Sequence, residues 1–91
     1  MIQGLLDSGV VKICSCKLCQ LYMNKGYPPR VFRFRSTDWF IMTLNNRLTY
    51  WKGCPRGYDI SRSSLEQFFY EVDEIDKEYI IFNIDIFRKE A

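Results

Sequence analysis

The spacing of apolar residues predicts a helix in the first quarter of the chain. Between Asp7 and Gly26 they recur at helical intervals, as on a helix with one packed side. This side would hold Val10, Val11, Cys14, Leu18, Leu21 and Tyr22. Asp7 or Ser8 can cap the N-terminus, and Gly26 suits the left-handed C-terminal position. Pro28 and Pro29 then prevent the helix from continuing.

Period-two alternation follows and predicts three strands. In Arg30–Arg35, phenylalanine alternates with arginine, which is typical of a strand with one buried side. Trp39–Leu44 and Arg47–Lys52 flank the pair Asn45-Asn46. Two asparagines between apolar runs favour a two-residue hairpin, because asparagine tolerates positive φ. Gly53–Gly57 is expected to be a loop after the third strand.

A second helix and a last strand complete the pattern. Ser63 and Glu66 form an S-x-x-E capping box, and helical spacing continues through Leu65, Phe68, Phe69, Val72 and Ile75. Tyr79–Phe87 alternates again and predicts a long strand. The order α-β-β-β-α-β predicts an α+β fold: a mostly antiparallel four-stranded sheet with two helices packed on one face. Residues 1–91 are expected to form a single compact domain.

The composition predicts a folded protein away from membranes. Of the 91 residues, 47% are hydrophobic and 16% aromatic, which argues against disorder. The N-terminal residues lack the basic start and apolar run of a signal peptide. No apolar run approaches the roughly 20 residues that cross a bilayer. We therefore expect a cytoplasmic protein with no membrane partner.

Three of the four cysteines lie within six positions, and two interpretations compete for them. In the helix prediction, Cys14 faces the apolar stripe, while Cys16 and Cys19 form a second patch about 60° apart. The alternative is a zinc site formed by Cys14, Cys16, Cys19 and Cys54. Structural zinc sites usually combine two ligand pairs, whereas these cysteines divide three and one. The sequence therefore favours the helix, and no metal or other cofactor is predicted. A thioredoxin-like redox role for Cys16 and Cys19 is disfavoured, because no strand clearly precedes the pair.

Histidine is absent, and this argues against an enzyme. Ser-His and Cys-His nucleophilic pairs are excluded, as are histidine-based zinc sites. No glycine-rich phosphate loop is present, since Gly53–Gly57 lacks the Lys-Ser/Thr ending of a P-loop.

The net charge of +2 conceals an uneven distribution along the chain. Residues 1–62 contain ten Lys/Arg and three Asp/Glu, a net charge of +7, whereas residues 63–91 contain three and eight, a net charge of −5. Such asymmetry indicates partner recognition. The acidic residues Glu66, Glu71, Asp73 and Glu74 could meet a basic protein surface, although charges on a helix usually just face water.

These observations favour a small, non-enzymatic protein-interaction module that acts by stoichiometric binding. Trp, Tyr and Arg dominate binding hot spots, and the candidate contacts are Arg33, Arg35, Trp39, Arg47, Trp51 and Arg56. Inhibitors and antidotes, such as phage proteins that block host defence, are often of this size. A protein target is the expected partner. The alternative is a single-stranded nucleic-acid-binding domain that uses the same basic and aromatic strands.

Overall fold

The computed structural model describes residues 2–35, 37–45, 47–57 and 60–88. Within these residues the chain is α+β, with five helices and one five-stranded sheet. The strands are β1 (Val11–Ile13), β2 (Val31–Phe34), β3 (Trp39–Leu44), β4 (Arg47–Lys52) and β5 (Arg62–Ser63). The helices are α1 (Ile2–Asp7), α2 (Lys17–Asn24), α3 (Leu65–Glu71), α4 (Glu74–Phe82) and α5 (Ile84–Phe87).

The sheet is antiparallel throughout, in the order β1-β2-β3-β4-β5. The expected strands around the hairpin are confirmed as β2, β3 and β4. Leu44 pairs with Arg47, so the connection has two residues, and Asn45 has the expected positive φ of 52°. The second turn residue, at position 46, lies outside the described residues. The antiparallel α+β prediction is therefore confirmed, and β1 and β5 are additional strands.

The single helix expected from Asp7 to Gly26 is wrong. Gly9 has a φ of +77°, which ends α1, and the next residues pair with β2 instead. The edge strand β1 gains backbone hydrogen bonds from the sheet, and Val11 is 1% exposed. The shorter helix α2 then begins at Lys17.

The long strand expected at Tyr79–Phe87 is also wrong, because α4 and α5 occupy this segment. Ile80, Ile84 and Phe87 follow one another at the i, i+4, i+7 spacing of a helix, so the run fits both periods. The side chain of Asp73 accepts a hydrogen bond from the Asp76 N–H (2.9 Å), which caps α4.

The capped helix α3 is confirmed, but its N-cap lies one residue later in the chain than expected. Its N-cap is Ser64, whose hydroxyl accepts a hydrogen bond from the backbone N–H of Gln67 (3.1 Å). The helix ends at Glu71, because Val72 adopts an extended conformation before α4 begins.

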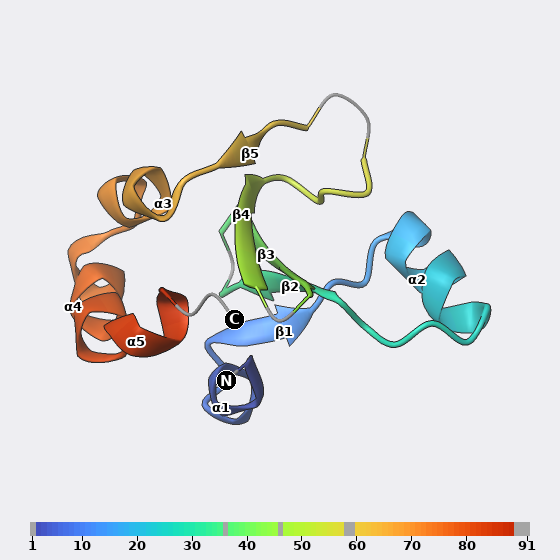
Figure 1. Cartoon of the computed structure of the whole chain (residues 1–91), viewed down its shortest axis with the longest axis horizontal. Coiled ribbons are helices and arrows are strands. Elements are labelled where there is room, and N and C mark those ends of the chain that lie inside the picture. The colour runs from blue at the N-terminus through green and yellow to red at the C-terminus, as the bar shows by residue number, and fades with distance from the viewer. Residues whose placement is uncertain (1, 36, 46, 58–59, 89–91) are drawn as a thin grey trace.

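The helices lie on two sides of the sheet. Side chains of α1, α3, α4 and α5 pack on the sheet residues Phe32, Phe34, Trp39, Ile41 and Tyr50 to form the main core. Figure 1 shows α3, α4 and α5 on one side of the sheet and α2 away from them. The sequence predicted two helices on one face of the sheet. The structure has more helices on that face, and α2, from the segment predicted as the first helix, lies on the other side. The opposite side of the sheet carries a second cluster around the cysteines and Val31.

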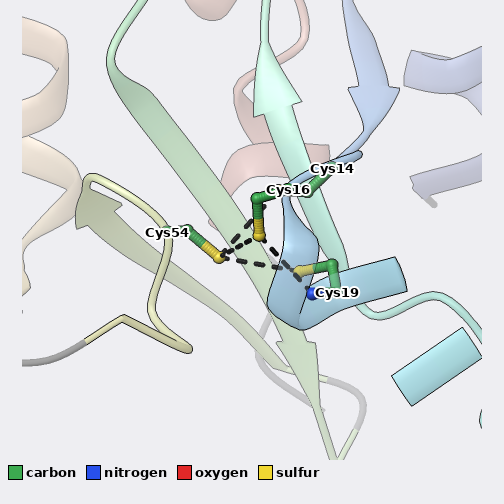
Figure 2. Close-up of side chains that lie close together, drawn as sticks. All are labelled: Cys14, Cys16, Cys19 and Cys54. Atoms are coloured by element: carbon green, nitrogen blue, oxygen red, sulfur yellow. Dashed lines mark hydrogen bonds between the residues drawn. The ribbon is translucent and has the colours of Figure 1, made fainter. Parts of the chain in front are cut away.

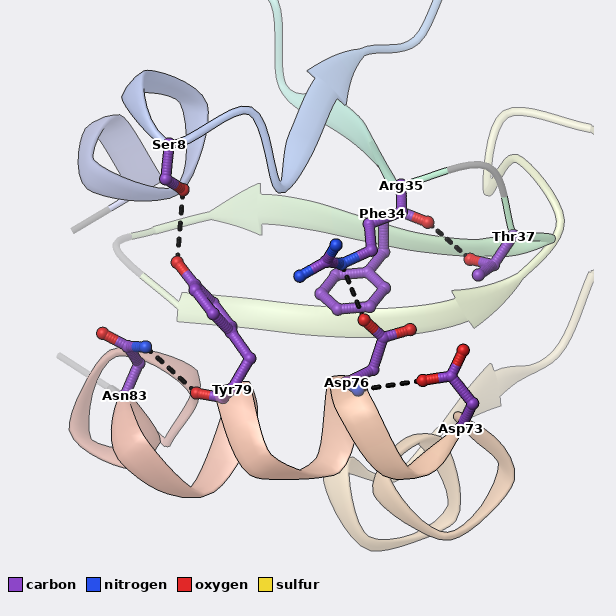
Figure 3. Close-up of polar contacts among 8 residues, drawn as sticks. All are labelled: Ser8, Phe34, Arg35, Thr37, Asp73, Asp76, Tyr79 and Asn83. Carbon is purple, nitrogen blue, oxygen red and sulfur yellow. Dashed lines mark hydrogen bonds and ion pairs between the residues drawn. The ribbon is translucent and has the colours of Figure 1, made fainter.

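An ion pair with one buried partner, Asp76, connects the end of β2 to α4. The Arg35 Nε lies 2.6 Å from an oxygen of Asp76, whose side chain is only 6% exposed. The guanidinium also lies over the rings of Phe34 and Tyr79, and Tyr79 reaches the Ser8 hydroxyl at the end of α1 (3.2 Å; Figure 3). Arg35 has a φ of 51°, so the backbone leaves β2 in the left-handed conformation here. The ion pair between Arg35 and Asp76 positions α4 against the sheet.

We expect Arg35→Met to lower the free energy of unfolding at pH 7 by about 1–3 kcal/mol. Breaking a fully buried pair costs about 3–5 kcal/mol, and the loss is smaller here because the Arg35 side chain is 40% exposed. Burial raises the pKa of Asp76, and Arg35 acts in the opposite direction. Without Arg35 the pKa of Asp76 rises further, and the folded state favours the protonated carboxyl.

The destabilisation by Arg35→Met should therefore be fully present at neutral pH and shrink as the pH falls through the pKa of Asp76. Urea unfolding over a pH series measures it. Adding Asp76→Asn should recover part of the stability and remove the pH dependence. A loss that is equal at all pH values would show that Arg35 contributes packing alone.

Candidate metal centre

Four cysteines from three segments meet on the side of the sheet that carries α2. Cys14 follows β1, Cys16 and Cys19 lie at the start of α2, and Cys54 lies in the loop after β4. Figure 2 shows the Cys54 side chain pointing from the loop after β4 toward Cys16 and Cys19. The four Sγ atoms all lie within 4.8 Å of one another.

The sulfur–sulfur distances agree with a tetrahedral site. The Cys54 Sγ lies 3.6 Å from those of Cys16 and Cys19, and 3.9 Å from that of Cys14. Four sulfurs that each lie about 2.3 Å from a central zinc ion are about 3.8 Å apart. All four thiols are free, and the distances are much longer than the roughly 2.05 Å of a disulfide bond.

Local backbone structure aims each sulfur at the same point. The Cys14 N–H donates to the Val31 carbonyl (2.9 Å), which continues the β1–β2 pairing to the first ligand. Cys16 is the N-cap of α2, and its sulfur accepts a hydrogen bond from the Cys19 N–H (3.5 Å). The Cys54 sulfur accepts one from the backbone N–H of Arg56. Such donors stabilise negative charge on sulfur.

The turn around Cys54 is built by its neighbours in sequence. Gly53 has a φ of +103°, which side chains other than glycine rarely adopt, and its Cβ would come within 3.3 Å of Ile60. The Gly57 N–H donates to the carbonyl of Cys54 (2.9 Å), which closes the turn. The segment expected to be a loop is therefore a tight turn that presents Cys54.

The cysteines also hold α2 in place. Among the eight described residues of α2, only Cys19 is buried, whereas Leu21 and Tyr22 are 54% and 42% exposed. Cys14, Cys19 and Val31 form a small cluster of their own, separate from the main core. An isolated helix this short is marginal in water. The position of α2 therefore depends on the sulfur cluster.

The thiols affect one another's pKa values. Burial raises the pKa of Cys16, but the hydrogen bond that its sulfur accepts from the Cys19 N–H, together with its hydrogen bonds with the neighbouring thiols, outweighs burial and lowers the pKa to about 7. Burial raises the pKa of Cys54 to about 11, and burial and its thiol neighbours raise that of Cys19 well above its usual range. Four thiolates at this separation repel one another unless a cation lies between them.

This arrangement can hold a zinc ion. Zinc favours four thiolates in a tetrahedron, and a site with four protein ligands leaves no position open for substrate or water. Such a centre is structural. The sequence placed Cys14, Cys16 and Cys19 together inside one long helix, and the structure corrects this, because Cys14 ends a strand and Cys16 precedes α2. The sequence disfavoured zinc because the ligands divide three and one instead of forming two pairs. The structure brings Cys54 to the other three cysteines all the same, and the turn at Cys54 supplies its own backbone donor.

The residues expected to contact a partner are spread over different parts of the molecule. Arg33, Arg47 and Trp51 point away from the main core, and Arg33 and Arg47 are exposed while Trp51 is half-buried. Trp39 is 3% exposed and belongs to the main core. Arg35 pairs with Asp76, as described above. Arg56 lies over the Tyr22 ring beside the metal centre, with 4.2 Å to the ring centroid.

The acidic residues singled out in the sequence are partly engaged within the protein. Glu71 pairs with Lys52 (2.8 Å), which lowers the pKa of Glu71 and raises that of Lys52. Asp73 caps α4, and Glu74 contacts Lys77 (3.3 Å). Glu66 is exposed.

Comparison with protein-family models, curated proteins and solved structures finds no match to this chain.

Proposed function

We propose that this protein is a non-enzymatic binding module whose α2 side is organised by a structural zinc ion. The observation that carries this proposal is the meeting of four cysteine sulfurs within 4.8 Å. In a folded protein, this many thiols rarely converge without a metal or a disulfide bond to hold them. Four reduced thiols fit a reducing compartment, and a cytoplasmic location stays a prediction.

Stoichiometric binding is the activity that the geometry supports. The metal centre has no open coordination position, and the chain contains no histidine that could act as a general base. A protein target is supported by a group of exposed apolar residues on the helices: Tyr70 (81% exposed), Ile75 (72%), Ile81 (60%) and Phe82 (89%). Exposed apolar residues that lie together mark interaction surfaces, and Tyr70 and Ile81 do so.

Tyr70 and Ile81 line a hollow of about 490 Å³ between the C-terminal helices, together with Leu65, Phe69 and Ile84. Glu66 and Arg88 lie in the same hollow, and Glu74 and Glu78 are exposed on α4. An apolar hollow beside the exposed acidic residues of α4 fits a partner that presents an apolar side chain flanked by Lys or Arg. An inhibitor or antidote of a basic protein, such as a phage anti-defence protein, would act through this surface.

No helix in the described part of the chain is long and apolar enough to cross a membrane.

Zinc itself is tested by native mass spectrometry of protein purified without added metal. We expect a mass increment of one zinc ion, lost at acidic pH in denaturing solvent. Cobalt substitution should give the intense absorption of a tetrahedral thiolate site. Protein that is folded, fully reduced and free of metal would contradict the proposal.

The protein partner is tested with Ile81→Glu, which places a charge in the helical hollow. Affinity capture from the source cell, after nuclease treatment, should recover a defined partner at one-to-one stoichiometry with the wild type and with Tyr22→Ala, a control on α2. Capture should fall at least tenfold with Ile81→Glu, because burying a charge against an apolar side chain is unfavourable. Equal capture by all three would exclude the helical hollow as the interface.

A further inference from the structure

The side of the sheet that faces away from the main core carries a row of side chains that crosses all five strands. The register pairs Lys12 with Arg33, Arg33 with Phe40, Phe40 with Trp51, and Trp51 with Arg62. Residues paired in register point to the same side of a sheet. The row therefore reads Lys, Arg, Phe, Trp, Arg, with two aromatic rings in the middle and basic residues at both ends.

The basic residues are sorted between the two sides of the sheet. In the five strands that the described residues form, no residue is acidic and five are basic. Lys12, Arg33, Arg47 and Arg62 lie on the side of the row, since Arg47 is an even number of positions from Trp51 in β4. The fifth, Lys52, lies on the other side and pairs with Glu71 of α3. No ion pair within the described part of the chain engages Lys12, Arg33, Arg47 or Arg62, so these charges are available to a partner.

The aromatic pair is held in a fixed orientation. Phe40 and Trp51 lie directly opposite each other on the neighbouring strands β3 and β4, where paired side chains are about 5 Å apart. The Trp51 Nε1 donates to the Thr49 hydroxyl (2.9 Å), and Phe40 packs against the cysteine cluster. The Arg33 guanidinium lies over the Phe40 ring, 5.8 Å from its centroid, while its Nε donates to the Thr37 carbonyl (2.6 Å). Both rings are half-buried, so one side of the pair stays accessible.

Two hollows flank the aromatic pair. One, of about 430 Å³, is lined by Lys12, Arg33 and Phe40 at the β1 edge. The other, of about 370 Å³, is lined by Arg47, Thr49 and Arg62 toward the β5 edge. The first hollow has three basic side chains, since Arg35 also lines it, and the second has two, which suits a phosphate or another small anionic group.

We propose that this row is a binding platform for single-stranded nucleic acid, with Trp51 and Phe40 as the stacking pair and Lys12, Arg33, Arg47 and Arg62 as the phosphate contacts. A partner for this surface must offer flat apolar rings and negative charge on both sides of them. Unpaired nucleotides supply both, and proteins that bind single strands combine aromatic stacking with a basic track. A duplex hides its ring faces and offers only its phosphates. The platform adds an activity to the proposed zinc-organised module and lies on the same side of the sheet as the cysteines. It rests in part on that centre, because Phe40 packs against the cysteine cluster, and Cys14 and Cys16 line the hollow at the β1 edge.

The test uses the full zinc-loaded chain and fluorescein-labelled oligothymidylate, oligouridylate and a DNA duplex, measured by fluorescence anisotropy over a salt series. We expect both single strands to bind more tightly than the duplex. The logarithm of affinity should fall linearly with the logarithm of salt concentration, with a slope of about −0.7 per phosphate contact. The ratio between oligothymidylate and oligouridylate distinguishes DNA from RNA as the natural ligand.

Trp51→Ala should weaken single-strand binding about 5- to 150-fold, which corresponds to the loss of one stacked base. Trp51→Phe should retain most of the affinity because it keeps a ring. Arg62→Gln should weaken binding and reduce the salt slope by about 0.7. Lys52→Gln is the matched control. Lys52 follows Trp51 in β4 and lies on the opposite side of the sheet, so this change also removes one positive charge but should leave the affinity and the salt slope unchanged.

Zinc content and the urea unfolding midpoint, measured on the same samples, show whether each variant is folded. The proposal is overturned if the wild type binds no single strand at low salt, or if Arg62→Gln and Lys52→Gln have equal effects. It is also overturned if Trp51→Ala is folded and binds as tightly as the wild type. A chain that holds zinc but fails these tests leaves the metal centre standing, so the two proposals fail separately.

Discussion

Cys54→Ser is expected to release the zinc ion and free α2 and the turn at residues 53–57 from the sheet. A serine hydroxyl cannot replace the thiolate, and three remaining ligands leave the site open. We expect the free energy that holds α2 in place to fall by about 5 kcal/mol or more, a fraction of the roughly 10–16 kcal/mol with which structural sites bind zinc. The main core should persist, because its side chains lie on the other side of the sheet.

Hydrogen–deuterium exchange measures this outcome segment by segment. Amides of Lys17–Asn24 should lose protection in Cys54→Ser, while those of α3 and the β3–β4 hairpin should keep it. Ser15→Ala is the control, because Ser15 is exposed between two ligands and contributes no sulfur. Full retention of zinc and of α2 protection in Cys54→Ser would contradict a four-cysteine centre.

Phe68→Ala is expected to lower the free energy of unfolding by about 3–5 kcal/mol, the usual loss for removing a buried phenylalanine. Phe68 is fully buried on α3 and lies at the centre of a group of rings. Its centroid is 5.0 Å from that of Phe34, 5.3 Å from Trp39, 5.1 Å from Tyr50 and 6.2 Å from Phe87. These contacts attach α3 and α5 to β2, β3 and β4, so a cavity at this position weakens most of the helix–sheet interface.

The matched control is Phe82→Ala, which removes the same side chain from an exposed position. Phe82 is 89% exposed, and we expect its removal to change stability by no more than about 0.5 kcal/mol. Urea unfolding of zinc-loaded protein measures both variants. If the two changes had similar effects, α3 could not lie over the sheet as described.

The aromatic pair of the proposed platform, Phe40 and Trp51, could have been predicted from the sequence. Two asparagines predicted a two-residue hairpin, and a hairpin of that length pairs Leu44 with Arg47. Counting outward from this pair places Phe40 opposite Trp51, as the structure shows. The same count places Trp39 on the other side, in the core. The prediction instead grouped Trp39 with Trp51, because it considered residue types without the register of the hairpin.

Other features could not be read from local patterns. An isoleucine-rich run at helical and at period-two spacing fits either element, and burial of Ile80 and Phe87 against the sheet selected the helix. A three-residue strand such as β1 has too few positions to show a period, and it exists because β2 offers a free edge. The helical spacing across Val10–Tyr22 was therefore coincidental for the residues before α2, which include the strand β1.

The sequence by itself determined the β2, β3 and β4 strands, the turn that joins the last two, the capped helix α3 and the segregation of charge. Each follows from interactions between residues close along the chain, where spacing and backbone preference decide the conformation. Only the tertiary structure decided that Cys54 reaches three cysteines 35 to 40 residues earlier, that α2 lies apart from the other helices, and that a basic and aromatic row crosses the side of the sheet that carries the cysteines. These arrangements depend on which distant segments pair and on which side each strand presents, and no local pattern contains that information.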